Sequence, residues 1–209
     1  MTSKKRSEVL SHFRKADPKV YPYVTTVDYK KWLSGAKNEE SYFKDLAEGI
    51  IAQQLGTASA RAIINRFLGL FPNEQPHPER LARMKPETIK KKIGTSLGKA
   101  NYLVNLAKAV DAGELNLAKI KSFTDEEVYR ELTKIKGIGP WTAEMFLIFS
   151  LGHEDIYSHG DYGLKRGIQK IYGLKKIPSE ATIKRITNHW KPYRSYGSIA
   201  LWHSLENST

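Results

Sequence analysis

The fold of this 209-residue chain is decided by the stretch Ile135-Lys136-Gly137-Ile138-Gly139-Pro140-Trp141-Thr142-Ala143. Its two glycines allow a sharp turn and leave no side chain between the backbone and a partner. Pro140 is typical of a first helical position, and the amides that open such a helix point outward toward an anion. The stretch therefore predicts a hairpin that binds phosphate. An ordinary tight connection between two packed helices, with Ile138 in the core, is the alternative.

Helical patterns flank this hairpin and recur along most of the chain. Thr124 and Glu127 form a capping-box pattern, and the apolar face that follows predicts a helix ending at Lys136-Gly137. A second helix is predicted from Pro140 to about Leu151-Gly152. No convincing alternating strand pattern occurs, so the fold class is predicted to be all-α. Further helices are predicted over residues 43–51, 60–68, 86–93, 98–112, 161–172, 179–190 and 196–205, with surface loops at 72–78 and 175–178.

The chain is strongly basic. It has 34 Lys and Arg residues against 22 Asp and Glu, a formal net charge of +12, and 40% apolar residues, which is enough for a folded core. Such a charge favours a polyanionic partner, either nucleic acid or an anionic membrane surface, although a merely basic protein is also consistent with it. No long apolar run and no signal-peptide pattern follow the basic segment Met1–Arg6. We therefore expect no membrane insertion and no secretion.

The composition also limits the chemistry. The chain contains no cysteine, which excludes disulfides, zinc fingers and a Cys-ligated iron–sulfur cluster. None of its six histidines is paired at i,i+4 with a nearby acid in a metal-binding pattern. We therefore expect no catalytic metal and no cofactor.

The segment Leu132 to Arg166 resembles the signature of the helix-hairpin-helix (HhH-GPD) DNA glycosylase superfamily, in its 3-methyladenine DNA glycosylase II branch. Three further segments resemble the same branch in the same order, and the resemblance covers residues from about 40 to 205. They are the double-glutamine segment Ile50–Leu55, the Gly/Ser/Lys turn Ile93–Leu103 and the entry to a C-terminal helix, Trp190–Tyr196.

The resemblance implies an architecture of two interleaved helical lobes with a DNA-reading cleft between them. One lobe would comprise residues 36–149 and end in the hairpin, and the other would combine residues 1–35 with 150–209. The expected partner is double-stranded DNA with a damaged base, bound by a monomer without a membrane. The protein would then work where DNA is, in a cytoplasm with a nucleoid or in a nucleus.

The implied activity is that of a monofunctional DNA glycosylase in base excision repair. It would flip alkylated purines such as 3-methyladenine or 7-methylguanine out of the duplex and hydrolyse the N-glycosidic bond. Members that also cut the strand carry a lysine nucleophile in the hairpin, where this chain has Trp141. Water would therefore be the nucleophile and an abasic site the product. The alternative is a non-catalytic protein of the same fold that binds damaged or abasic DNA.

Asp161, 20 residues after Trp141, is the candidate catalytic residue. It immediately precedes a helical pattern, so a purely structural role as N-cap is the alternative. The two roles are compatible, because backbone amides that hold a carboxylate also stabilise its anionic form. In the superfamily the matching Asp stabilises positive charge on the deoxyribose and orients or deprotonates the attacking water.

The remaining site residues follow from the resemblance. Trp141, Tyr162 and Trp202 match aromatic positions of the base pocket, and Met145 stands where some relatives have an aromatic; core packing is the alternative for Trp202. Leu55 matches the wedge that fills the gap left by the extruded base, with a core position as the alternative. A monovalent cation at the hairpin would be compatible with the pattern. The expected DNA-binding residues are Gln53, Gln54, Leu55, Gly56, Ser96, Lys99, Lys136, Gly137, Ile138, Gly139 and Thr142.

Besides Met145, the segment Ser158-His159-Gly160 and the residue Gly56 depart from the family pattern. Ser158-His159-Gly160 replaces the Pro-containing or acidic approach to the catalytic Asp, so the loop that aims Asp161 can differ. Gly56 offers no side chain where some relatives contact DNA. These departures are the reason for keeping the non-catalytic alternative.

Overall fold

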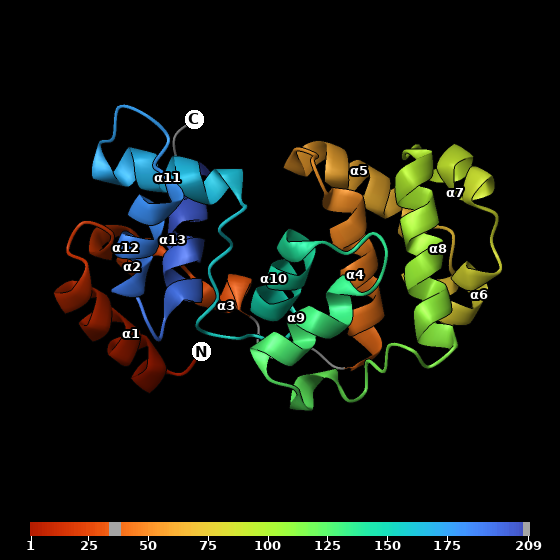
Figure 1. The fold of residues 1–209 in the computed structure, drawn as a ribbon, viewed down its shortest axis with the longest axis horizontal. Coiled ribbons are helices and arrows are strands. Elements are labelled where there is room, and N and C mark those ends of the chain that lie inside the picture. Colours follow the sequence, from red (N-terminus) through yellow and green to blue (C-terminus); the bar gives the residue numbers. More distant parts are fainter. Residues whose placement is uncertain (34–38, 207–209) are drawn as a thin grey trace. The chain divides into compact units, whose positions relative to one another are not determined.

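The computed structural model describes residues 1–33 and 39–206 (Figure 1). Helices and connecting turns form the whole of these two ranges, which contain no strand, so the predicted all-α class is confirmed. Two compact units make up the chain. The central unit is Lys37–Phe146, and the terminal unit combines Met1–Ala36 with Leu147–Thr209. The lobe boundary expected at residues 35–36 lies outside the described residues.

The central unit is built around α8 (Leu97–Asp111), which packs against α4 (Glu39–Ala52), α6 (Pro78–Ala82) and α7 (Pro86–Ile93) (Figure 1). Six residues of α8 are buried, and they occupy more than one face, as expected for a helix with neighbours on several sides. The other helices with residues in this unit are α5 (Thr57–Leu68), α9 (Asp125–Thr133) and the first part of α10 (Pro140–Phe149); Pro72–Glu74 and Ile120–Ser122 form 3-10 turns.

In the terminal unit, α11 (Tyr162–Tyr172) and α13 (Arg194–Glu206) pack side by side (Figure 1). Their close approach depends on Gly167, because a Cβ atom there would lie 2.7 Å from the Cβ of Leu201. The helix α13 also contacts α2 and α12, and α1 contacts α2. The remaining bounds are α1 (Ser3–Ala16), α2 (Tyr21–Thr26), α3 (Tyr29–Trp32) and α12 (Glu180–Asn188).

A buried carboxylate ties the two sequence segments of the terminal unit together. Asp17, only 7% exposed, accepts hydrogen bonds on Oδ1 from the backbone N–H groups of Lys19 and Val20, each at 3.2 Å. Its Oδ2 accepts from Trp190 Nε1 at 2.6 Å and from the Tyr172 hydroxyl. Four donors compensate the carboxylate for its loss of water. The interaction joins the α1–α2 turn to the end of α11 and the start of the α12–α13 connection.

The predicted helices agree with the structure in most of their bounds. The capping box of Thr124 and Glu127 is present, and α7 has the predicted range of residues 86–93. The helix before the hairpin ends at Thr133, three residues earlier than predicted, because Ile135 N–H already bonds to Leu132 O in an i→i+3 turn.

The structure also contains helices that the sequence did not predict. In α1 only Val9 and Phe13 are buried, which is too thin an apolar pattern to be recognised. The short helices α2, α3 and α6 have one buried residue each. The segment 72–78, predicted as a surface loop, contains a 3-10 turn and the buried Pro76. None of the helices formed by residues 1–33 and 39–206 has the length and apolar character needed to cross a bilayer.

We expect Asp17→Ala to lower the free energy of unfolding by about 3 kcal/mol, because several buried donors lose their acceptor. Urea denaturation followed by circular dichroism measures the change. Asp28→Ala is the matched control, since Asp28 is an exposed N-cap that accepts a hydrogen bond from Lys30 N, and its loss should cost about 1 kcal/mol or less. Equal effects of the two substitutions would contradict the anchoring role of Asp17.

Candidate functional site

The glycine hairpin lies between the end of α9 and Pro140, the first residue of α10. Lys136 is exposed, whereas the side chains of Ile138 and Thr142 are 4% and 2% exposed. The expected contribution of Ile138 to DNA binding is therefore limited to its backbone, and its side chain occupies the core as in the alternative interpretation. The exposed Lys136 and the backbone of the turn remain the groups that can meet a phosphate.

Gly137 is required by packing inside the protein. Its φ of +112° is a conformation that favours glycine, and a Cβ atom there would lie 2.3 Å from both Cβ and Cγ of Tyr102 on α8. Gly139 differs, because nothing lies within 4 Å of a Cβ built on it. Of the two glycines, Gly139 is thus the one that faces open space.

Gln53 connects the end of α4 to the hairpin. Its Nε2 donates to Gly137 O at 2.9 Å and to Thr142 Oγ1 at 3.0 Å. A neutral side-chain amide has two N–H donors, and both are used in these bonds. The structure therefore gives Gln53 a bracing role in addition to the expected DNA contact, which stays a prediction.

The turn between α4 and α5 presents Leu55. Gln54 adopts the left-handed conformation with φ of +56°, and Leu55 N–H donates to Ala52 O at 3.1 Å. Leu55 is 37% exposed, so it is not a core residue. Gly56 is extended at the N-cap of α5, with no atom within 4 Å of a built Cβ. The geometry is compatible with the wedge role predicted for Leu55.

Lys99 makes intramolecular contacts that the sequence did not reveal. Its Nζ donates to Ile51 O at 2.7 Å and to Gln53 O at 2.6 Å, and burial lowers the pKa of its ammonium. A lysine at this place satisfies carbonyls at the C-terminal end of α4 and complements the helix dipole. The nearby Ser96, an exposed residue, is the N-cap of α8 and accepts from Lys99 N at 3.2 Å. The bonds give Lys99 a structural role, and its expected contact with DNA stays a prediction.

Asp161 is the N-cap of α11, as the sequence indicated. Its Oδ1 accepts hydrogen bonds from Leu164 N at 2.7 Å and from Trp202 Nε1 at 3.1 Å. Both donors stabilise the ionised carboxylate, and the indole fixes its orientation from a different helix. The structure thus brings together two of the predicted site residues, Asp161 and Trp202.

Two aromatic residues that the sequence did not single out extend this arrangement. Trp202 lies 5.6 Å from Phe149, and Phe149 lies 6.2 Å from Trp32, with tilts of 38° in both pairs. Trp32 is in the four-residue helix α3, where no periodic pattern could reveal its partner. The row Trp32–Phe149–Trp202 ends at the indole whose Nε1 donates to Asp161 Oδ1.

The other predicted pocket residues are distributed over both units. Tyr162 follows Asp161 in the terminal unit and is 64% exposed. Trp141 and Met145 lie one helical turn apart on α10 in the central unit, and both are half-buried. The central unit therefore holds Trp141 and Met145, and the terminal unit holds Tyr162 beside Asp161.

Gly163 is a further residue that the sequence did not identify. A Cβ atom at this position would lie 3.1 Å from Asp161 Oδ1 and 3.2 Å from Trp202 Cδ1. A larger residue would have to displace the carboxylate or the indole. The absence of a side chain at position 163 is thus needed for the Asp161–Trp202 hydrogen bond in its present geometry.

The departure Ser158-His159-Gly160 forms a partly buried loop before Asp161. Ser158 is fully buried, and the His159 ring makes an edge contact with Tyr157 at 5.0 Å. Burial lowers the pKa of His159, and nearby Lys184 adds to the effect. Both effects favour the neutral form of the His159 ring.

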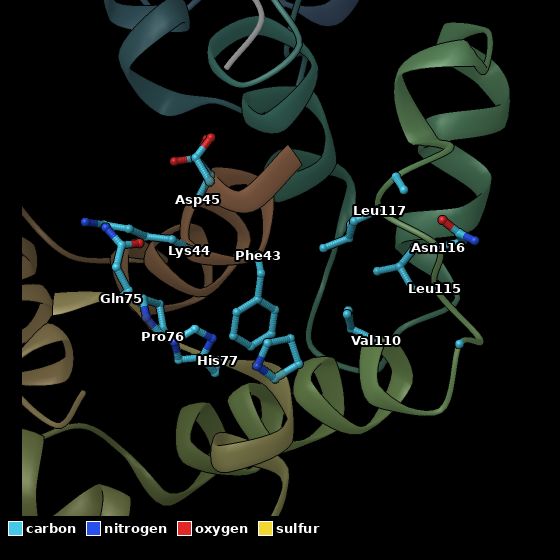
Figure 2. A pocket seen from close by; sticks show the side chains of 14 residues that line it. Phe43, Lys44, Asp45, Gln75, Pro76, His77, Val110, Leu115, Asn116 and Leu117 are labelled. Atoms are coloured by element: carbon cyan, nitrogen blue, oxygen red, sulfur yellow. The ribbon is translucent and has the colours of Figure 1, made fainter. Parts of the chain in front are cut away.

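A hollow of about 1010 Å³ in the central unit lies away from the predicted site residues (Figure 2). It is lined by residues from the start of α4, the segment before α6 and the loop after α8, including Phe43, His77 and Leu115. None of the residues predicted to bind DNA or a base lines it. Within the described ranges there is also no group of three or more His, Asp or Glu residues that could hold a metal ion.

Comparison with known proteins shows clear similarity. The family described as "HhH-GPD superfamily base excision DNA repair protein" matches residues 47–192. DNA-3-methyladenine glycosylase 1 of Schizosaccharomyces pombe is 33% identical over 162 residues, which cover 77% of this chain and 71% of that protein. YfjP of Bacillus subtilis is 30% identical over 172 residues; the alignment covers 79% of this chain and spans only 60% of that relative.

Solved structures are similar over nearly the whole chain. The Schizosaccharomyces pombe 3-methyladenine DNA glycosylase Mag1 in complex with abasic DNA has a TM-score of 0.87 and 29% identity, covering 96% of this chain and 98% of that one. A DNA-3-methyladenine glycosidase from Bacillus halodurans has a TM-score of 0.77 and 30% identity, covering 96% and 89%.

We expect Gly139→Asp to weaken binding to every duplex, damaged or not, by about tenfold or more, because the new carboxylate faces phosphate. Its thermal stability should match that of the unmodified chain, since position 139 faces open space. Fluorescence anisotropy with labelled duplexes measures the affinity. Gly69→Asp, an exposed change at the C-cap of α5, controls for net charge.

Gly137→Asp is not an equivalent test, because it must also displace Tyr102 and should lower the melting temperature. Unchanged duplex affinity of Gly139→Asp would remove the hairpin from the DNA interface.

Proposed function

Because this chain belongs to the HhH-GPD superfamily of base excision DNA repair proteins, we propose that it is a DNA glycosylase that hydrolyses the N-glycosidic bond of alkylated purines in duplex DNA. The superfamily resemblance found in Leu132–Arg166 is confirmed by the family match over residues 47–192. The observation that carries the proposal is the Asp161 carboxylate, held by a helix N-terminal amide and by the indole of Trp202.

Asp161 supplies the electrostatic part of the reaction. As the purine departs, positive charge develops on the deoxyribose, and a fixed carboxylate stabilises that charge without having to reorganise. The bonds from Leu164 N and Trp202 Nε1 hold the Asp161 carboxylate in place before the substrate arrives. The same group orients or deprotonates the water that attacks the sugar.

Base recognition relies on aromatic surfaces. Purines such as 3-methyladenine and 7-methylguanine are cationic when alkylated in DNA, and a ring face can attract such a base by about 0.5–2 kcal/mol. Trp202 is held by its bond to Asp161 and by Phe149, so its ring is fixed next to the carboxylate. Tyr162, Trp141 and Met145 are the further candidates for contact with the base.

DNA binding and base extrusion are assigned to the central unit. Lys136 and the hairpin backbone bind phosphate, and the exposed Leu55 enters the stack when the damaged base leaves it. The partner is double-stranded DNA with a damaged base, bound by a monomer in the compartment that holds the DNA.

The hairpin position that carries the nucleophile for strand cleavage in other members holds no amine in this chain. Trp141 stands where members that cut the strand have a lysine, and an indole cannot form a Schiff base with the sugar. The proposed reaction therefore ends at the abasic site.

Asp161→Asn should reduce release of methylated purines from alkylated duplex DNA by about 100-fold or more while binding to abasic DNA stays near normal. The assay is run in EDTA, with Asp111→Asn, an exposed aspartate at the end of α8, as the control. Comparable release by Asp161→Asn and the unmodified chain would defeat the catalytic assignment.

The same assay distinguishes the non-catalytic alternative. No release by the unmodified chain, together with tight binding to abasic DNA, would assign the protein to damage binding without catalysis.

The unmodified chain should leave abasic sites intact and give no covalent adduct with DNA under borohydride. Trp141→Lys should also fail to form an adduct, because a Schiff base needs the correct placement of the amine as well as the amine itself. Denaturing electrophoresis before and after alkali measures both outcomes. A borohydride-trapped adduct of the unmodified chain would overturn the monofunctional assignment.

A further inference from the structure

We propose that Lys99 is a positioning residue that fixes the Leu55 turn and couples it to the glycine hairpin through one face of α8. The inference rests on the proposed function, because it assigns Lys99 to the base-extrusion step of that reaction. This role differs from the direct DNA contact expected for Lys99 from the sequence.

The first support is the pair of bonds that Lys99 makes. Its Nζ donates to Ile51 O at 2.7 Å and to Gln53 O at 2.6 Å, on either side of the C-terminal residue of α4. Carbonyls at the end of a helix lack partners within it, so an ammonium group there fixes the last turn. Gln53 O is the carbonyl immediately before Gln54, whose φ of +56° begins the turn that presents Leu55.

The second support is the position of three α8 residues at a spacing of three. Lys99 holds the Leu55 turn, Tyr102 lies against Gly137, and Asn105 Nδ2 donates to Lys136 O at 3.3 Å. Residues three apart in a helix share a face, so a single face of α8 supports both loops.

The third support is a direct link between the two loops. The backbone carbonyl of Gln53 accepts a hydrogen bond from Lys99 Nζ. The side-chain amide of Gln53 donates to Gly137 O and Thr142 Oγ1. The contacts therefore form a closed ring from α8 to the Leu55 turn, to the hairpin and back to α8. All of these residues belong to the central unit.

The ring has a consequence for base extrusion. The hairpin holds the DNA backbone, and Leu55 must enter the stack at a fixed distance from it. A non-glycine residue in the left-handed conformation persists only where surrounding contacts hold it. Without the Lys99 ammonium, the Gln54 conformation can relax and Leu55 loses its fixed position, while the phosphate-binding groups stay in place.

The test compares Lys99→Met with Lys108→Met, a matched change at an exposed lysine of the same helix. The probe is a duplex with 2-aminopurine next to a tetrahydrofuran abasic analogue, whose fluorescence rises when the stack is opened. We expect the rise to fall by about tenfold in Lys99→Met and to stay normal in Lys108→Met. Lys99→Arg, which keeps two donors, should recover part of the signal.

The salt dependence of duplex binding separates positioning from phosphate contact. The logarithm of the DNA association constant falls linearly with the logarithm of the salt concentration, and loss of one phosphate contact reduces the steepness of that fall by about one. We expect the slope of Lys99→Met to equal that of the unmodified chain. A slope reduced by about one, or a normal fluorescence rise, would overturn the proposal.

Folding is checked by the melting temperature. If Lys99→Met fails to fold, Lys99→Gln takes its place, because the shorter amide keeps a polar side chain but cannot hold both carbonyls. The same loss of fluorescence is expected for Lys99→Gln, and an unmodified signal would overturn the proposal.

Excision assays distinguish failure of this proposal from failure of the proposed function. If Lys99 acts in extrusion, Lys99→Met should release a methylated purine slowly from a matched pair and within about threefold of normal from a mismatch, where extrusion costs less. Equal rates for the unmodified chain and Lys99→Met on the matched pair would overturn the positioning role alone. Absence of release by the unmodified chain would overturn the glycosylase function, while the fluorescence still reports on Lys99.

Discussion

The contact between Gly137 and the ring of Tyr102 is the constraint on which the central unit depends. It brings the hairpin backbone directly onto α8, with no room for a Cβ atom between them. Once the hairpin lies there, Gln53 can reach Gly137 O and Thr142 Oγ1, and Asn105 can reach Lys136 O. The glycine thus sets the place of the hairpin, and the side chains of α4 and α8 then hold it.

In the terminal unit, one carboxylate organises the fold and another carries the proposed chemistry. Asp17 is buried and has four donors, which makes it an anchor between sequence segments far apart. Asp161 has two donors on one oxygen and is only half-buried. The contrast has a physical reason, since an almost fully buried carboxylate cannot reach a substrate, whereas a half-buried one at a helix start can.

Local patterns revealed much of this arrangement. The capping box, the Gly139-Pro140 helix start and the N-cap at Asp161 depend on neighbouring residues, so they could be predicted. The roles of Lys99 and Gly163 could not, because each acts on atoms from a distant segment of the chain. The row of Trp32, Phe149 and Trp202 was missed for the same reason, as its members are more than 50 residues apart.

The sequence by itself determined the helical class and the hairpin, because helix periodicity, capping and glycine turns are properties of short segments. The candidate carboxylate and the pocket aromatics came from the family resemblance of the same sequence. Only the tertiary structure decided what those residues touch. It buried Ile138 and Thr142, exposed Leu55 and turned Lys99 toward the end of α4. The physical reason is that burial and hydrogen-bond partners depend on which helices pack together, and that choice is made by the whole core rather than by any one segment.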